Sequence, residues 1–142
     1  MRATYLMIFA TLLCAATPAA LADSCGSYDM PKAEQAVYTI GTWHDLDSFY
    51  SKLKACDDGA LAEGFSDRVA DLLAYHWDTV EDLQSITEHS EDFEQFVLYH
   101  IDSLMTPAEA AAIIDNTSNH CPKDADELCQ KIAREVPRAK LQ

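Results

Sequence analysis

The stretch LLAYHWDTV at residues 72–80 and the stretch FVLYHIDSL at residues 96–104 share the pattern Tyr-His-x-Asp at an offset of 24 residues. The two stretches match mostly at their apolar positions, which recur with the spacing of one face of an α-helix. The repeat therefore predicts two amphipathic helices that pack in a similar way. Two copies are fewer than a stacked repeat array needs, so the pattern does not indicate a solenoid.

The same helical period extends over the rest of the chain, and no segment sustains the apolar–polar alternation of a β-strand. We therefore expect an all-α fold, an irregular bundle of six or seven short helices around one core, pinned by two disulfides. Glycine and proline are scarce and no low-complexity linker occurs. Residues 23–142 are accordingly expected to form a single helical domain.

Side chains that can cap a helix mark four expected helix starts, at Thr42, Ser66, Ser90 and Thr106. The start at Thr106 is the clearest, because a proline follows at the first helical position and Glu109 can reach back to the cap.

Other helix boundaries are expected from weaker signals. A short helix is expected over residues 32–40, and a new helix start near Val80. The last helix should run from about Asp124 and end before Pro137. The residues expected to face the core are Leu46, Phe49, Tyr50, Leu53, Cys56, Val69, Leu72, Leu73, His76, Val80, Leu83, Ile86, Phe93, Phe96, Val97, His100, Ile101, Leu104, Ala110, Ile113, Ile114, Thr117, Leu128, Cys129, Ile132 and Val136.

Residues 1–22 have the layout of a secretory signal peptide, with Arg2 near the start, an apolar run over residues 6–16 and a small-residue ending at Ala22. Cleavage after Ala22 leaves 120 of the 142 residues. The expected location is therefore periplasmic or secreted. No later segment resembles a membrane span, so we expect no stable membrane insertion. A lipid-anchored form through Cys14 or Cys25 is the alternative.

The chain is strongly acidic, with 10 Lys and Arg against 24 Asp and Glu and a net charge of −14. Loss of Arg2 with the signal peptide would lower the net charge to −15. Such a surface repels the phosphates of nucleic acids and anionic lipids. A basic protein partner is favoured, although acidity also serves simply to keep an exported protein soluble. Nothing in the sequence indicates a cofactor or an oligomeric state.

Four cysteines remain after the expected cleavage: Cys25, Cys56, Cys121 and Cys129. An even number of cysteines in an exported chain favours two disulfides over thiol chemistry. Of the three possible connectivities we favour Cys25–Cys56 with Cys121–Cys129, because each pair brackets one helical unit. A zinc site would favour close pairs of the form Cys-x-x-Cys, and the sequence has none.

The histidines of the repeat are interpreted as structural. Positions two apart on a helix point in nearly opposite directions, so neither His76 with Asp78 nor His100 with Asp102 can hold one ion. We expect His76 and His100 to lie on core faces near helix ends, where imidazole can satisfy open carbonyls. The alternative is a small-molecule or metal-binding module, if the fold brings His76 and His100 together.

Catalytic motifs are absent from the sequence. It contains neither a Gly-x-Ser-x-Gly elbow nor a glycine-rich phosphate loop. A small hydrolase remains an alternative, on condition that a histidine meets both a nucleophile and an orienting carboxylate in a cleft. The candidate binding residues are instead aromatic anchors and acidic loop positions. They are Trp43, Tyr75, Trp77, Tyr99, Asp57 and Asp58.

The block CDDGALAEGFSDRVADLLAYHWD at residues 56–78, with FVLYHID at residues 96–102 and Cys-Pro at residues 121–122, resembles a group of small exported bacterial proteins to which no activity is assigned. The resemblance implies a bacterial, periplasmic setting. Together these observations predict a non-enzymatic periplasmic protein that binds another protein, with an inhibitor or immunity-type factor as one form of that function.

Overall fold

The computed structural model describes residues 25–139, and side chains up to Val136. The expected signal peptide and Cys14 lie outside the described residues. Within them every regular element is helical, which confirms the predicted fold class. The α-helices are α1 (Met30–Ala36), α2 (Trp43–Leu53), α3 (Gly59–Tyr75), α4 (Val80–Thr87), α5 (Glu91–Tyr99), α6 (Pro107–Asn119) and α7 (Asp126–Ala139). Short 3₁₀ turns, η1 (Val37–Thr39), η2 (Lys54–Cys56), η3 (Trp77–Thr79) and η4 (Lys123–Ala125), precede or follow them.

Three of the four expected caps are confirmed. The side chains of Thr42, Ser90 and Thr106 accept hydrogen bonds from backbone N–H groups at the starts of α2, α5 and α6. At Thr106 the full capping box forms, because Glu109 also accepts from the Thr106 N–H. These interactions join residues only three positions apart, which is why the sequence alone predicts them.

The expected cap at Ser66 is wrong. Asp58 caps α3 instead, and the helix begins at Gly59, whose φ of 55° suits only glycine well. The apolar face of α3 therefore extends back through Leu61 and Phe65, both fully buried. Ser66 lies inside the helix on that buried face, where its hydroxyl needs a tertiary partner.

Most of the other departures from expectation lie near helix ends. The helix α7 runs through Pro137 to Ala139, because a proline in the last turn removes one N–H while Leu128, Ile132 and Val136 still bury the helix face. Three residues expected in the core are exposed instead. They are His76 just beyond α3, Leu104 in the turn after α5, and Ile114 within α6.

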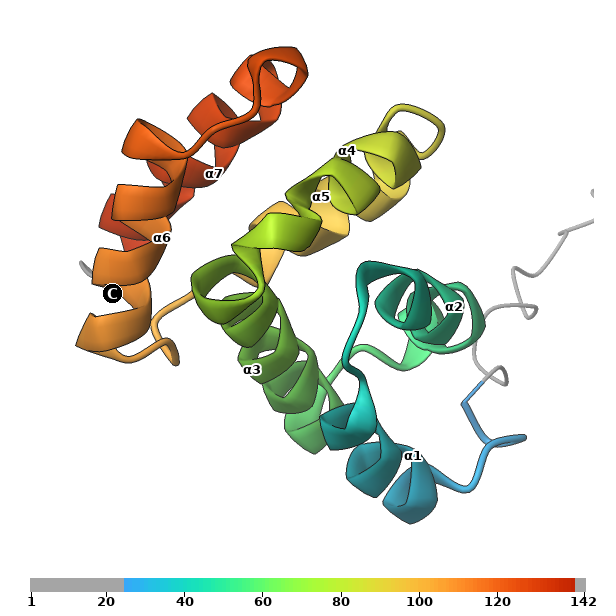
Figure 1. Cartoon of the computed structure of the whole chain (residues 1–142). Coiled ribbons are helices and arrows are strands. Elements are labelled where there is room, and N and C mark those ends of the chain that lie inside the picture. Colours follow the sequence, from blue (N-terminus) through green and yellow to red (C-terminus); the bar gives the residue numbers. More distant parts are fainter. Residues whose placement is uncertain (1–24, 140–142) are drawn as a thin grey trace, which may run out of the picture.

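The helix α3 lies at the centre of the arrangement (Figure 1). It packs against α6, which packs in turn against α7, while α1 and η1 cover its other side and α2 lies against α4. At the crossing of η1 and α3, the fully buried side chain of Val37 sits directly over Gly64. An aromatic cluster fills the interior, with the Phe65 and Phe96 rings 5.0 Å apart and the Tyr50 and Phe96 rings 4.6 Å apart.

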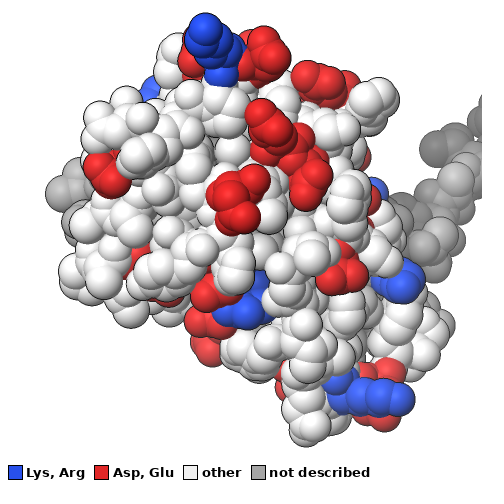
Figure 2. Space-filling model, viewed as in Figure 1, with Lys and Arg blue, Asp and Glu red and all other residues white. Residues whose placement is uncertain are grey.

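Both expected disulfides, Cys25–Cys56 and Cys121–Cys129, are present. Disulfides of this kind persist in oxidising, extracytoplasmic compartments. No helix among residues 25–139 is both long enough and apolar enough to cross a bilayer. On the outer surface, Asp and Glu side chains gather over the region where α4 and the start of α7 lie (Figure 2).

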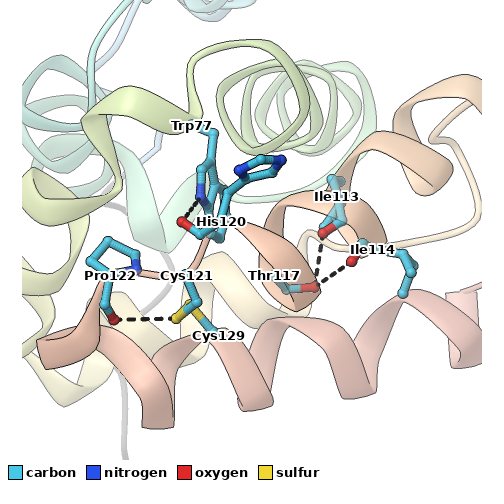
Figure 3. Close-up of a disulfide and its surroundings, with 8 residues drawn as sticks. All are labelled: Trp77, Ile113, Ile114, Thr117, His120, Cys121, Pro122 and Cys129. Atoms are coloured by element: carbon cyan, nitrogen blue, oxygen red, sulfur yellow. Dashed lines mark hydrogen bonds between the residues drawn. A yellow bond between two sulfur atoms is a disulfide. The ribbon is translucent and has the colours of Figure 1, made fainter.

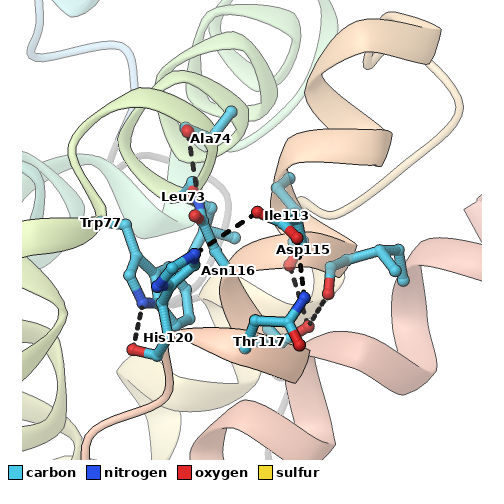
Figure 4. A network of polar contacts seen from close by, with 10 residues as sticks. Leu73, Ala74, Trp77, Ile113, Asp115, Asn116, Thr117 and His120 are labelled. Atoms are coloured by element: carbon cyan, nitrogen blue, oxygen red, sulfur yellow. Dashed lines mark hydrogen bonds and ion pairs between the residues drawn. The ribbon is translucent and has the colours of Figure 1, made fainter.

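The C-terminal ends of α3 and α6 are tied together by two side chains. The Asn116 amide of α6 donates to the carbonyls of Leu73 at 2.9 Å and Ala74 at 3.2 Å, near the end of α3 (Figure 4). In return, Trp77 Nε1 after α3 donates to the His120 carbonyl at the end of α6, at 2.9 Å. Asn116 of α6 and Trp77 of η3 thus each supply a donor for carbonyls at the end of the facing helix.

The Cys121–Cys129 bridge lies next to this junction and fastens the end of α6 to α7 (Figure 3). Asn116 stands in an Asn-Thr-Ser triplet of the glycosylation type. Because both Asn116 contacts use the amide nitrogen that a glycan would modify, this triplet has a structural role in the folded protein.

Candidate functional site

Four polar side chains from separate parts of the chain meet inside the molecule. His100 Nδ1 lies 2.9 Å from Ser66 Oγ, and His100 Nε2 lies 3.1 Å from Asp57 Oδ2. The Ser66 hydroxyl donates to Asp102 Oδ2 at 2.6 Å. We call the chain Asp57, His100, Ser66, Asp102 the polar network. His100 is 2% exposed and Ser66 is 3% exposed, so its centre is shielded from solvent.

Local structure explains how each member reaches the network. Asp57 precedes the cap of α3, and Ser66 lies on the buried face of that helix. His100 is the residue directly after α5, at its C-cap, and Asp102 follows in a turn closed by the Leu104 N–H on Asp102 Oδ1 at 2.8 Å. The network therefore joins the connection before α3 to the connection after α5.

Aromatic rings and one unpartnered oxygen surround the imidazole. The rings of Phe96, Tyr99 and Phe65 lie 4.4, 5.2 and 5.7 Å from the His100 ring. Asp57 Oδ1 is covered and has no hydrogen-bond partner among the described protein atoms. Charges in such surroundings are costly unless an opposite charge or a donor lies close by.

The two copies of Tyr-His-x-Asp differ in the structure. The expectation that His100 and Asp102 point apart fails, because α5 ends at Tyr99 and both side chains turn to Ser66. In the first copy the His76 side chain is 51% exposed and pairs with Asp71 at 3.5 Å. His76 and His100 thus have separate partners. No group of three or more His, Cys, Asp or Glu within residues 25–139 is placed to hold a metal ion.

The polar network meets one part of the condition stated for a hydrolase, a histidine next to a hydroxyl and a carboxylate, but does not meet the other part, an open cleft. His100 pairs with a hydroxyl and with a carboxylate, as a catalytic triad requires. Ser66, however, lies within α3, is almost fully covered, and directs its proton to Asp102 rather than to the imidazole. This burial leaves the hydroxyl almost no surface that a substrate carbonyl could contact.

The candidate aromatic anchors divide into buried and exposed residues. Trp43 is 1% exposed, so its prediction as a surface anchor is wrong: it lies on the buried face of α2 together with Leu46 and Tyr50. Trp77 is half-buried and bound to α6. Tyr75 and Tyr99 are exposed, Tyr99 to 75%, so both remain available for contact.

The two acidic candidates have structural partners. Asp57 binds His100 in the polar network, and Asp58 caps α3 through its contact with the Gly59 N–H at 2.8 Å. Neither carboxylate is simply a free surface charge. The acidic surface that the fold does assemble lies elsewhere.

A groove of about 330 Å³ runs between α4 and η4. Glu81, Glu88 and Asp124 supply its charge, and no Lys or Arg lines it. A second groove of about 200 Å³, between α4, α5 and α7, shares Gln84 and Glu88 with the first. We call the two together the acidic groove; it lies where Figure 2 shows the gathered carboxylates.

The one lysine among the described residues that line the acidic groove, Lys131, is paired with two carboxylates. Lys131 Nζ donates to Glu94 at 2.8 Å and lies 3.0 Å from Glu127. The hydrogen bond to Glu94, followed by that to Glu127, raises the pKa of Lys131 above its ordinary value. The groove thus keeps a net negative charge even where it contains a lysine.

Sequence reasoning missed both assemblies, although one signal for the groove was present. Between Arg68 and Lys123 the sequence has no Lys or Arg. The carboxylates of that interval are Asp71, Asp78, Glu81, Asp82, Glu88, Glu91, Asp92, Glu94, Asp102, Glu109 and Asp115.

Comparison of the chain with protein-family models, curated proteins and solved structures gave no match.

Proposed function

We propose that this chain is a non-enzymatic periplasmic protein that binds a basic protein partner through the acidic groove. The observation that carries the proposal is the pair of adjoining hollows along α4, rimmed by carboxylates and lacking a free cation among the described lining residues. Two disulfides favour an oxidising compartment, and the periplasm is the bacterial compartment of that kind.

The charge distribution favours a protein over other ligands. A carboxylate-lined surface repels nucleic acid and anionic lipid, whereas it attracts Lys and Arg side chains. The lining residues Glu81, Gln84, Ser85 and Glu88 follow one side of α4, and such a shallow strip suits an extended contact rather than a small buried ligand.

Electrostatic complementarity of this kind raises the rate of encounter and selects partners of opposite charge. An inhibitor or immunity-type factor would use it to cover a basic surface of a toxin or enzyme. Tyr75 and Tyr99 are exposed at the ends of α3 and α5, outside the groove lining, and offer aromatic anchors that would add affinity which charge alone does not provide.

The proposal is tested first by crosslinking in cells. A photoreactive residue at Ser85, in the groove, should capture a partner whose contacting peptide is rich in Lys and Arg. The matched control is the same residue at Ser51, which is exposed on α2 and does not line the groove. Equal capture of the same proteins at both positions would speak against a specific groove.

The captured partner is then purified and its affinity measured. Neutralising Glu81, Glu88 and Asp124 with the amide residues should weaken binding at least tenfold and reduce its salt dependence. The control variant makes the same charge change at three exposed acidic residues outside the groove: Glu63, Asp67 and Asp115. Equal losses in the two variants would reduce the effect to overall charge and overturn the proposal.

The hydrolase alternative rests on the contacts of His100 with Ser66 and Asp57. It predicts turnover of an activated p-nitrophenyl ester that disappears in the Ser66→Ala variant. Because Ser66 is covered, we expect no turnover that depends on this residue. A rate that falls to background in Ser66→Ala, with the fold intact by circular dichroism, would favour the hydrolase over the binding protein.

A further inference from the structure

The polar network has three contacts, each of which needs one hydrogen. These contacts are Asp57 with His100, His100 with Ser66, and Ser66 with Asp102. An ionised carboxylate supplies no hydrogen, the hydroxyl supplies one, and imidazole supplies one when neutral or two when protonated. With neutral His100 and two carboxylates, three contacts share only two hydrogens.

We infer that the folded polar network binds one extra proton, carried by His100 as an imidazolium, and that this proton holds together the connections before α3 and after α5. His100 then donates from Nε2 to Asp57 and from Nδ1 to Ser66, and Ser66 donates to Asp102. Every contact has its hydrogen, and the imidazolium carries a charge opposite to that of the carboxylates.

The proton is assigned to His100 rather than to a carboxyl group for two reasons. Asp102 already accepts two hydrogen bonds, from Ser66 and from the Leu104 N–H, and such bonds favour the ionised carboxylate. Asp57 has one covered oxygen without a partner, and its only ion-pair partner in the described structure is His100. A buried carboxylate in that position needs the positive charge next to it.

Other ionisable groups near the network do not replace His100. Tyr99 flanks its ring, and Tyr50 on α2 lies close enough for Asp57 to affect the Tyr50 pKa. Lys54 stands over the Tyr50 ring at 5.3 Å, where it faces the phenol. Asp47 and Asp92 face the same phenol from α2 and α5. Of these carboxylates, Asp57 contacts His100 directly and increases the attraction for a cation there.

Loss of the extra proton has a directional effect. With neutral His100, one of the three contacts would place two acceptor atoms against each other without a hydrogen between them. That contact would break, either between Asp57 and His100 or between Ser66 and Asp102. A proton that the folded state holds and the unfolded chain releases contributes stability at low pH, and this contribution is lost as pH rises. The fold should therefore loosen on the alkaline side as His100 loses its proton.

The first test observes the ring nitrogens of His100 directly, by ¹⁵N NMR of the full mature chain at about pH 7.5. An isolated histidine, with a pKa of about 6.5, is mostly neutral there. We expect both His100 nitrogens to be protonated, while His44 and His89, which are exposed, serve as internal references. A neutral His100 ring at that pH would overturn the inference.

Asp102→Asn provides the sharpest variant, because it changes the hydrogen supply and keeps the shape. Its amide can donate to Ser66, Ser66 can then donate to His100 Nδ1, and neutral His100 can donate to Asp57. The variant should fold with every contact satisfied by a neutral His100, so its alkaline decline in stability between about pH 6 and about pH 9 should be clearly smaller than that of the parent chain, with only the attraction of Asp57 for the imidazolium remaining. An unchanged decline would contradict the inference.

Ser66→Ala provides a second test in case the Asp102→Asn variant does not fold. Removing the hydroxyl leaves only the Asp57 contact, which neutral His100 satisfies by itself. Its stability should be lower than that of the parent chain at about pH 6 and should decline less than that of the parent chain up to about pH 9, because only the attraction of Asp57 for the imidazolium remains. A purely structural role for Ser66 would lower stability equally at every pH, and that result would also reject the extra proton.

Discussion

The close packing of Val37 against Gly64 can be tested with Gly64→Ala. In most helix interiors this change is favourable by about 1 kcal/mol, because alanine has the higher helix propensity. Here a Cβ on residue 64 would overlap a methyl group of Val37. Val37 is fully buried and β-branched, so its side chain has little freedom to rotate away.

The expected magnitude follows from these two opposing effects. Overpacking of a well-filled core costs about 1 to 3 kcal/mol, and the full burial and stiffness of Val37 place this site at about 2 to 3 kcal/mol, above the gain in helix propensity of about 1 kcal/mol. We therefore expect Gly64→Ala to lower the free energy of unfolding by about 1 to 2 kcal/mol. In a Val37→Ala background the overlapping methyl is gone, and the same substitution should raise stability by about 1 kcal/mol.

Urea denaturation followed by circular dichroism, with the disulfides intact, measures all four members of this double-mutant cycle. The coupling between the two positions should be about 2 to 3 kcal/mol, with unchanged dependence of the unfolding free energy on urea. If Gly64→Ala stabilises the parent chain, or has the same effect in both backgrounds, Val37 does not restrict this position and the reasoning fails.

Three further predictions concern the junction, a disulfide and a buried phenol. Asn116→Ala should lower the free energy of unfolding by about 1 to 3 kcal/mol in the same urea assay, because two carbonyls of α3 lose their donor. Replacing Cys121 and Cys129 with alanine opens a loop with a sequence separation of 8 and should cost about 2.5 kcal/mol in that assay. The pKa of Tyr50 is raised, first by burial and then by nearby carboxylates, so its neutral form is favoured in the fold. Its stabilising contribution is present below about pH 10 and is lost as pH rises further, and spectrophotometric titration of Tyr50→Phe should lack the last phenol to ionise.

Much of the helical framework follows from local chemistry. Thr106 and Glu109 form their capping box with each other, so no distant residue is needed to fix the start of α6. The cysteine count and export pattern similarly predicted the two disulfides. The predicted cap at Ser66 was wrong because a serine side chain can either cap a helix start or form a buried hydrogen bond. In the fold it contacts His100, and Asp58 caps α3.

The polar network could not be predicted in this way. His100 is separated by 34 residues from Ser66 and by 43 from Asp57, and their contact depends on how α3 and α5 pack. The same holds for the acidic groove, which needs α4 and η4 side by side. The burial of Trp43 is a further example, since either face of a short helix start can point inward.

The sequence by itself determined that this chain is helical, acidic and cross-linked by two disulfides, because propensity, capping, charge and cysteine number are properties of residues and their near neighbours. Only the tertiary structure decided that His100 lies between Ser66 and Asp57 and that carboxylates of α4 and η4 share one groove. These arrangements depend on the relative placement of helices, which burial of the common core fixes and no short stretch of sequence encodes.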